Sequence, residues 1–184
     1  MAHIWARDPH GFYIEPTWCS EGLFAVERFA GSIWDPFAGS GRIVEAARRA
    51  GYQAYGSDIV DRGNHLDAIV DFFDCRQSHG NSIVCNPNFH VCRPELIGHA
   101  LKLADKAAMI WLARRLNAAR WLRDTPLARV YFLTPRPSMP PGHVILAGEK
   151  PGGGQQDFVW LIWDHKHCGA PELQWLHRDS RRAP

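Results

Sequence analysis

Several features that would narrow the function at once are absent from this sequence. No apolar run approaches the roughly 18 residues of a membrane span, and the first residues lack the basic-then-apolar pattern of a signal peptide. The sequence also contains no internal repeat and no Cys-x-x-Cys pair. We therefore expect a cytoplasmic protein without a membrane segment.

An excess of charge of one sign is also missing. Lysine and arginine number 21 against 19 aspartates and glutamates, which leaves a formal charge of +2. Nucleic acid, if it binds, must then be held by local groups of arginines. The five cysteines are an odd number, and we expect them to be reduced thiols. His165, His167 and Cys168 lie close in sequence, but their spacing matches no closed four-ligand site, so we expect no metal.

What the sequence does contain is an alternation of apolar runs and helix-like segments. Its 184 residues are 46% hydrophobic and suffice for one domain, 1–184. The alternation predicts an α/β fold with a mostly parallel, seven-stranded sheet whose last strand is antiparallel. The expected strands are 31–35, 53–57, 67–70, 82–85, 107–112, 128–133 and 157–163, and the expected helices are 18–30, 41–50, 94–105 and 114–123. A loop rich in proline and glycine, 134–156, joins the last two strands, and residues from about 177 to 184 are expected to form a flexible tail.

A glycine-containing loop follows the first expected strand, with the sequence Asp35-Pro36-Phe37-Ala38-Gly39-Ser40-Gly41. Small residues at such a strand end let the backbone approach a ligand, although a tight turn without a ligand has the same pattern. Asp58 follows the next strand, 17 residues after Gly41, near the spacing at which a carboxylate reaches ribose hydroxyls. Pro36 stands where a dinucleotide site has its first glycine, so a nucleoside without phosphates fits better.

The tetrapeptide Asn86-Pro87-Asn88-Phe89 follows the fourth expected strand. An exocyclic aromatic amine is a poor nucleophile because its lone pair is delocalised into the ring. Two acceptors, the side-chain oxygen of Asn86 and the backbone carbonyl of Pro87, would hold the two amine hydrogens and favour the pyramidal nitrogen. Phe89 would stack on the base. The alternative is a strand-terminating turn in which the asparagine bonds its own backbone.

In combination, these motifs resemble the class I S-adenosylmethionine-dependent methyltransferases, in particular the small phage-type DNA N6-adenine enzymes. The resemblance runs from about Tyr13 to Trp163 and includes Tyr13-Ile14-Glu15-Pro16 and Asp157-Phe158-Val159-Trp160. It implies a Rossmann-like fold and S-adenosylmethionine as cofactor. The glycine loop would lie along the methionine moiety, Asp58 would hold the ribose, and Asp71 with Phe72 would border the adenine. The cofactor residues so implied are Tyr13, Pro16, Asp35, Pro36, Phe37, Ala38, Gly39, Gly41, Asp58, Ile59, Asp71, Phe72 and Asn86.

The predicted reaction is methyl transfer to an exocyclic amine, with adenine N6 in DNA as the first expectation. Asn86, Pro87 and Phe89 are the predicted catalytic residues, and Asn88, Phe89, Arg114 and Arg136 the predicted substrate contacts. Nucleic acid is the expected partner, DNA before RNA, and a partner subunit is expected to assist target recognition because 184 residues leave little room for it.

Three alternatives stay open. The acceptor could be a base in RNA or a glutamine amide in a protein. The fold could instead be a degenerate one that binds nucleic acid or another subunit, because Asn88 replaces the second proline usual in the family. The arginines could also form an ordinary solvated helix face.

Overall fold

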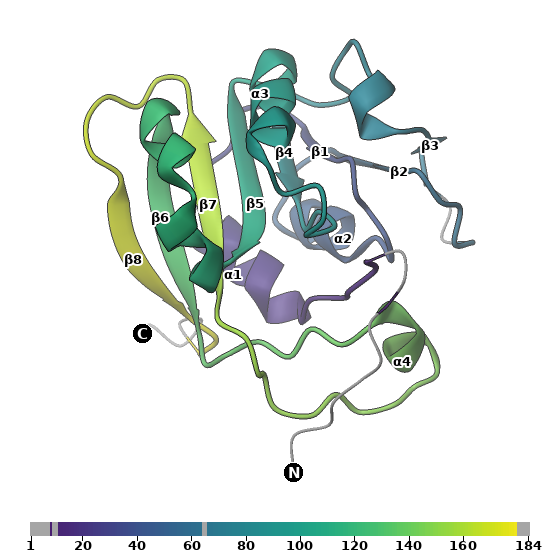
Figure 1. The fold of residues 1–184 in the computed structure, drawn as a ribbon. Helices are drawn as coiled ribbons and strands as arrows, with labels where there is room; N and C mark the ends of the chain where they lie inside the picture. Colours follow the sequence, from purple (N-terminus) through teal and green to yellow (C-terminus); the bar gives the residue numbers. More distant parts are fainter. Residues whose placement is uncertain (1–7, 9–10, 64–65, 180–184) are drawn as a thin grey trace.

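The computed structural model describes residues 8, 11–63 and 66–179, which build one eight-stranded sheet covered by helices on both faces (Figure 1). The strands are β1 (Ile33–Asp35), β2 (Ala54–Asp58), β3 (Ala68–Ile69), β4 (Ser82–Cys85), β5 (Lys106–Leu112), β6 (Leu127–Thr134), β7 (Phe158–Asp164) and β8 (Glu172–His177). Their order is β3-β2-β1-β4-β5-β7-β6-β8. Strand β7 runs antiparallel to β5 and β6, and the remaining pairs are parallel. Strand order therefore reverses between β1 and β4, where open parallel sheets bind ligands.

Two apolar clusters cover the two faces of the sheet. On one face lie α1 (Thr17–Val26) and α2 (Arg42–Arg49), and on the other α3 (Pro94–Leu103) with the 3-10 turns η2 (Ala113–Ala118) and η3 (Arg120–Asp124). The sheet is buried on both faces in β5 and β7, which explains their continuous apolar sequence. Among the described residues, no helix is both long and apolar enough to cross a membrane.

The predicted α/β fold is confirmed, but its end differs from the prediction. The strand predicted to be antiparallel, 157–163, is β7 and runs antiparallel to β5 and β6, but an eighth strand, β8, follows it and pairs in parallel with β6 at the edge of the sheet. Sequence patterning missed β8 because only Leu176 of its six residues is buried. The expected flexible tail begins inside this strand, and the Arg178 amide donates to the Thr134 carbonyl at 2.8 Å. Residues 180–184 lie outside the described part of the chain.

The expected helix 114–123 is also wrong in type. The chain forms the two short 3-10 turns η2 and η3, separated at Ala119, whose ψ of 59° interrupts the helical hydrogen bonds. The other predicted helices and strands are present, with ends that shift by a few residues.

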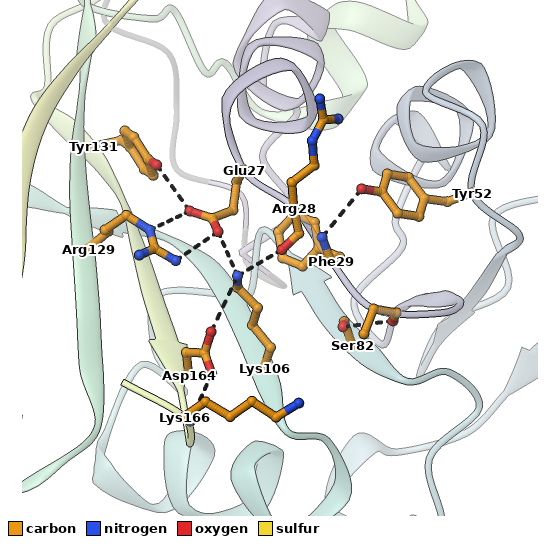
Figure 2. A network of polar contacts seen from close by, with 11 residues as sticks. Glu27, Arg28, Phe29, Tyr52, Ser82, Lys106, Arg129, Tyr131, Asp164 and Lys166 are labelled. Carbon is orange, nitrogen blue, oxygen red and sulfur yellow. Dashed lines mark hydrogen bonds and ion pairs between the residues drawn. The ribbon is translucent and has the colours of Figure 1, made fainter. Parts of the chain in front are cut away.

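Glu27, just after α1, joins this helix to the sheet through a network of charged groups (Figure 2). Its carboxylate accepts hydrogen bonds from Lys106 Nζ at 2.6 Å, from Arg129 Nε and Nη2 at 2.6 and 2.8 Å, and from Tyr131 Oη at 3.0 Å. Burial raises the pKa of Glu27, but the bonds from Arg129 and Lys106 outweigh it, so the pKa lies below its ordinary value. Because Lys106 begins β5 and Asp164 ends the antiparallel β7, the network lies at the amino edge of the parallel strands and leaves the carboxyl edge free.

Candidate functional site

Two adjoining cavities open at the carboxyl edge of the sheet. The first, of about 270 Å³, lies between the strand ends of β1, β2 and β4 and the segment 11–15. The second, of about 330 Å³, lies between the loop after β4 and the long loop 135–156. Both are lined by Gly11, Tyr13 and Asn88, so the two spaces meet at these residues.

Most of the predicted cofactor residues line the first cavity. These are Tyr13, Asp35, Pro36, Phe37, Ala38, Gly39, Asp58, Ile59, Asp71, Phe72 and Asn86. Two predicted residues do not: Pro16 lies directly before α1, and Gly41 lies directly before α2 with a φ of 79°. Their positions support the shape of the two loops and provide no wall of the cavity.

The glycine loop is held by two aspartates. The Phe37 amide donates to Asp35 Oδ1 at 3.0 Å, and the Gly39 amide donates to Asp58 Oδ2 at 2.9 Å. Gly39 has a φ of 52°, and a Cβ there would lie 2.8 Å from the Phe12 ring, so glycine is required. Asp58 Oδ1 also accepts from Arg62 Nη1 at 2.9 Å. A ribose at Asp58 would therefore share the carboxylate with the loop and with Arg62.

Buried acidic groups dominate the charge of the first cavity. Glu15, Asp35 and Asp58 all line it, with relative exposures of 5%, 1% and 7%. Burial raises the pKa of Asp35 well above its ordinary value, and the charges of Glu15 and Asp58 raise it further. Burial likewise raises the pKa of Glu15, against the lowering effect of its bond from Asn86. A cationic ligand would offset this repulsion, so the cavity favours positive charge.

The orientation of the Asn86 side chain follows from its two acceptors. Its Nδ2 donates to the Tyr13 carbonyl at 3.1 Å and to Glu15 Oε2 at 2.9 Å. Both amide hydrogens are used, so the amide cannot be turned without losing both bonds. Asn86 Oδ1 has no hydrogen-bond donor in the described part of the chain and is left to accept from a ligand.

The rest of the tetrapeptide forms a turn beside the two cavities. Asn88 Oδ1 accepts from the His90 amide at 2.9 Å, as in an Asx turn, and the Asn88 carbonyl accepts from the Val91 amide at 3.0 Å. This side-chain bond constrains the loop at the position where the methyltransferases that the sequence resembles have a second proline. Pro87 is buried but lines neither cavity.

Aromatic and basic side chains line the second cavity. Phe89 stacks on Phe158, with ring centroids 5.7 Å apart, and both contribute to the wall. Arg114 and Arg115 lie beside them, and Arg115 Nη1 donates to the Phe89 carbonyl at 2.5 Å. Arg136, predicted as a substrate contact, lines neither cavity. It forms an exposed ion pair with Asp157, 2.6 Å from Nε to Oδ1.

The segment before α1 and the loop 135–156 lie side by side and are joined by backbone hydrogen bonds (Figure 1). The Gly142 amide at the start of α4 (Gly142–Leu146) donates to the Phe12 carbonyl at 2.8 Å, and the Ile14 amide donates to the Pro140 carbonyl at 3.2 Å. Phe12 also lies under the Arg62 guanidinium, 4.2 Å from the ring centroid. The segment 11–15 thus lines both cavities, and the loop 135–156 that is bonded to it lines the second.

Sequence reasoning missed four residues of this site: Phe12, Glu15, Arg62 and Arg115. Glu15 offered a signal, because it is a carboxylate between apolar Ile14 and Pro16 in a motif already recognised. Arg62 lies one helical turn after Asp58 but in a loop, and Phe12 meets Gly142 only through the tertiary fold. Within the described residues, no group of three or more His, Cys, Asp or Glu side chains could hold a metal ion.

The sequence matches no protein-family model and no curated protein. Solved structures do share the fold. One is "putative RNA methyltransferase PH1948" of Pyrococcus horikoshii, with a TM-score of 0.58 and 16% identity over 80% of this chain and 81% of that one. Another is the protein Thermoplasma acidophilum 1320, with a TM-score of 0.53 and 14% identity over 79% and 82% of the two chains. At such identities the likeness establishes a Rossmann-like fold and leaves the reaction open.

Proposed function

We propose that this protein is an S-adenosylmethionine-dependent methyltransferase that acts on an exocyclic amine, with adenine N6 in DNA as the acceptor. The observation that carries the proposal is the meeting of two unlike cavities. One is acidic and ends at Asn86, and the other is aromatic and basic and begins at Phe89. Tyr13 and Asn88 line both, so a ligand in each would meet at the tetrapeptide.

The first cavity has the chemistry that S-adenosylmethionine requires. The cofactor carries positive charge on its sulfonium and ammonium groups, and it supplies an electrophilic methyl group. Asp35, Glu15 and Asp58 would offset that charge, with Asp58 also within reach of the ribose. Asp71 and Phe72 line the same cavity beyond the glycine loop, as expected for the adenine end.

The tetrapeptide would orient the acceptor amine. Asn86 Oδ1 would accept one amine hydrogen. Pro87, the predicted second acceptor, is buried and lines neither cavity, so its carbonyl is not part of this proposal. Bound S-adenosylmethionine would supply the methyl group, and Asn86 would hold the amine nitrogen in place to attack it. The carbon–sulfur electron pair would leave with S-adenosylhomocysteine, and the extra proton of the nitrogen would go to water. Holding nitrogen and methyl in line can lower the barrier by about 7–11 kcal/mol, so no strong base is needed.

The second cavity fits a planar base with a phosphate beside it. Phe89 and Phe158 offer an aromatic wall, and Arg114 is exposed at its edge, where it could pair with a phosphate. A base can enter only if it is unpaired or flipped out of a duplex. The same amine-binding turn would accept a base in RNA or a glutamine amide, and these are the competing acceptors.

The test is transfer of tritiated methyl groups from S-adenosylmethionine to adenine-unmethylated DNA, to RNA and to protein, followed by digestion and chromatography. We expect label in N6-methyladenine from DNA. Asn86→Ala should lower the turnover by about 10²–10³-fold, as for loss of one oriented polar group in other active sites, while Asn117→Ala on exposed η2 should match wild type. Label in RNA or glutamine instead would replace the acceptor, and a protein that neither binds S-adenosylmethionine in calorimetry nor transfers methyl would refute the proposal.

A further inference from the structure

A buried carboxylate stands directly behind the predicted amine-binding side chain. Glu15 is 5% exposed, and its Oε2 lies 2.9 Å from Asn86 Nδ2. Glu15 precedes α1, and Asn86 follows β4, so the contact joins two segments that are far apart in sequence. It arises from the tertiary fold and cannot be inferred from the tetrapeptide.

The carboxylate is not needed to hold its own segment in place. The backbone around it is fixed by other bonds: the Ile14 amide donates to the Pro140 carbonyl, and Arg42 Nη1 donates to the Glu15 carbonyl at 2.9 Å. In the described part of the chain, Asn86 is the side chain that donates to the Glu15 carboxylate. The charge of a bound cofactor would offset part of the cost of burying this acid, and the bond to Asn86 points to a second role for it.

We infer that Glu15 is a positioning residue, which sets the Asn86 amide so that its oxygen faces the acceptor amine. An asparagine amide can be turned end over end, and the wrong orientation would present two donors to an amine that itself donates. Glu15 and the Tyr13 carbonyl are both acceptors, so together they hold Nδ2 inward. A hydrogen bond to a carboxylate also polarises the amide and makes Oδ1 a stronger acceptor.

The same contact explains the residue type at position 86. A carboxylate there would place negative oxygen beside both the Tyr13 carbonyl and Glu15, at the distances that now separate donor from acceptor. Glu15 therefore favours asparagine over aspartate at position 86. This inference rests on the proposed function, because the oriented oxygen matters only if an amine is bound there.

The inference predicts that the two positions can be exchanged. Asn86→Asp should be inactive, because two carboxylates then compete at the contact. In the double variant Glu15→Gln/Asn86→Asp, the side-chain amide at position 15 can donate to one oxygen of the carboxylate at position 86, and the second carboxylate oxygen is again left for the amine. The Tyr13 carbonyl still faces the first oxygen, so the recovery is partial. We expect this double variant to recover about tenfold or more of the turnover lost in Asn86→Asp, within the coupling range of contacting residues.

Removing the acceptor tests positioning more directly. Glu15→Leu should lower kcat by about 10²-fold at saturating cofactor, comparable to a displacement of 1 Å in an active site, with KM for DNA changed little. Glu15→Gln keeps an acceptor and should retain more of the turnover than Glu15→Leu. Glu21→Leu is the matched control, because Glu21 is a half-buried acid in the adjacent helix α1. This variant should leave kcat unchanged.

A measurement without turnover separates this inference from the proposed function. In ¹H–¹⁵N spectra of the unliganded protein, the Asn86 side-chain amide, assigned by its absence in Asn86→Asp, should show two hydrogen-bonded protons in wild type and one in Glu15→Leu. Unchanged amide signals, or no recovery in the double variant of an active enzyme, would overturn the inference. A wild type with the expected amide signals but no methyl transfer would refute the proposed function instead.

Discussion

Replacing Glu27 by glutamine should destabilise the protein by about 3 kcal/mol, at the lower end of the range for breaking a buried ion pair. The substitution keeps the shape but removes a charge that accepts four hydrogen bonds, from Lys106, Arg129 and Tyr131. The lower end applies for two structural reasons. Lys106 keeps a second partner, Asp164, 3.4 Å away, and Arg129 is 21% exposed and can reach water.

Urea unfolding followed by tryptophan fluorescence measures this loss directly. In a thermal scan it corresponds to about 2–4 °C for each kcal/mol in a chain of this size, or about 6–12 °C in total. Glu45→Gln is the matched control. Its pair with Arg49 spans 3.8 Å between side chains that are 62% and 53% exposed, so the change should stay within about 0.5 kcal/mol.

The pH dependence supplies a second check on the same residue. The pKa of Glu27 is lowered in the folded state, so its ionised form stabilises the protein fully above the unfolded pKa of about 4.3. This stabilisation is lost as the pH falls through the lowered folded pKa, and the gap between wild type and Glu27→Gln should close there. A loss below about 1 kcal/mol at neutral pH, or a gap that widens in acid, would refute the reasoning.

Three further predictions concern the site. Gly39→Ala should destabilise the protein by about 1–2 kcal/mol and weaken S-adenosylhomocysteine binding in calorimetry, because the left-handed backbone and the Phe12 ring exclude a Cβ. Gly98→Ala in α3 is the control, and it should be neutral or stabilising because a Cβ there meets open space. Arg115→Ala should raise KM for DNA about tenfold by releasing the Phe89 carbonyl, and it should leave cofactor affinity unchanged. Arg120→Ala, at an exposed arginine, is the control and should change neither KM nor cofactor affinity. Equal effects from the two variants would contradict this assignment. Affinity for S-adenosylmethionine should increase as the pH rises above the ordinary range of a carboxyl group, because burial raises the pKa values of Asp35 and Glu15 and their negative charge therefore appears at higher pH. Affinity that falls with rising pH would contradict an acidic cofactor site.

The parts of the site that could be predicted are those whose signal is local. The glycine loop, Asp58 and Asn86 each follow a strand, and parallel strands bring their carboxyl ends to one edge, so pattern alone placed them in one cavity. Arg136 failed the same reasoning because its position depends on the path of the long loop, where Asp157 captures it. Strand β8 was missed because its apolar residues do not share one face: Leu173 and Trp175 are exposed on one side of the strand, and the buried Leu176 lies on the other.

Periodicity and strand-end motifs in the sequence determined the α/β fold, the order of its central elements and the residues that gather at the first cavity. Tertiary structure alone decided which other groups contact these residues. It set Glu15 against Asn86, Arg115 against Phe89, and Phe12 between Gly39 and Gly142. The physical reason is that hydrogen-bond orientation and close packing depend on atoms brought together from distant segments. The type of a residue does not determine which distant residue will contact it.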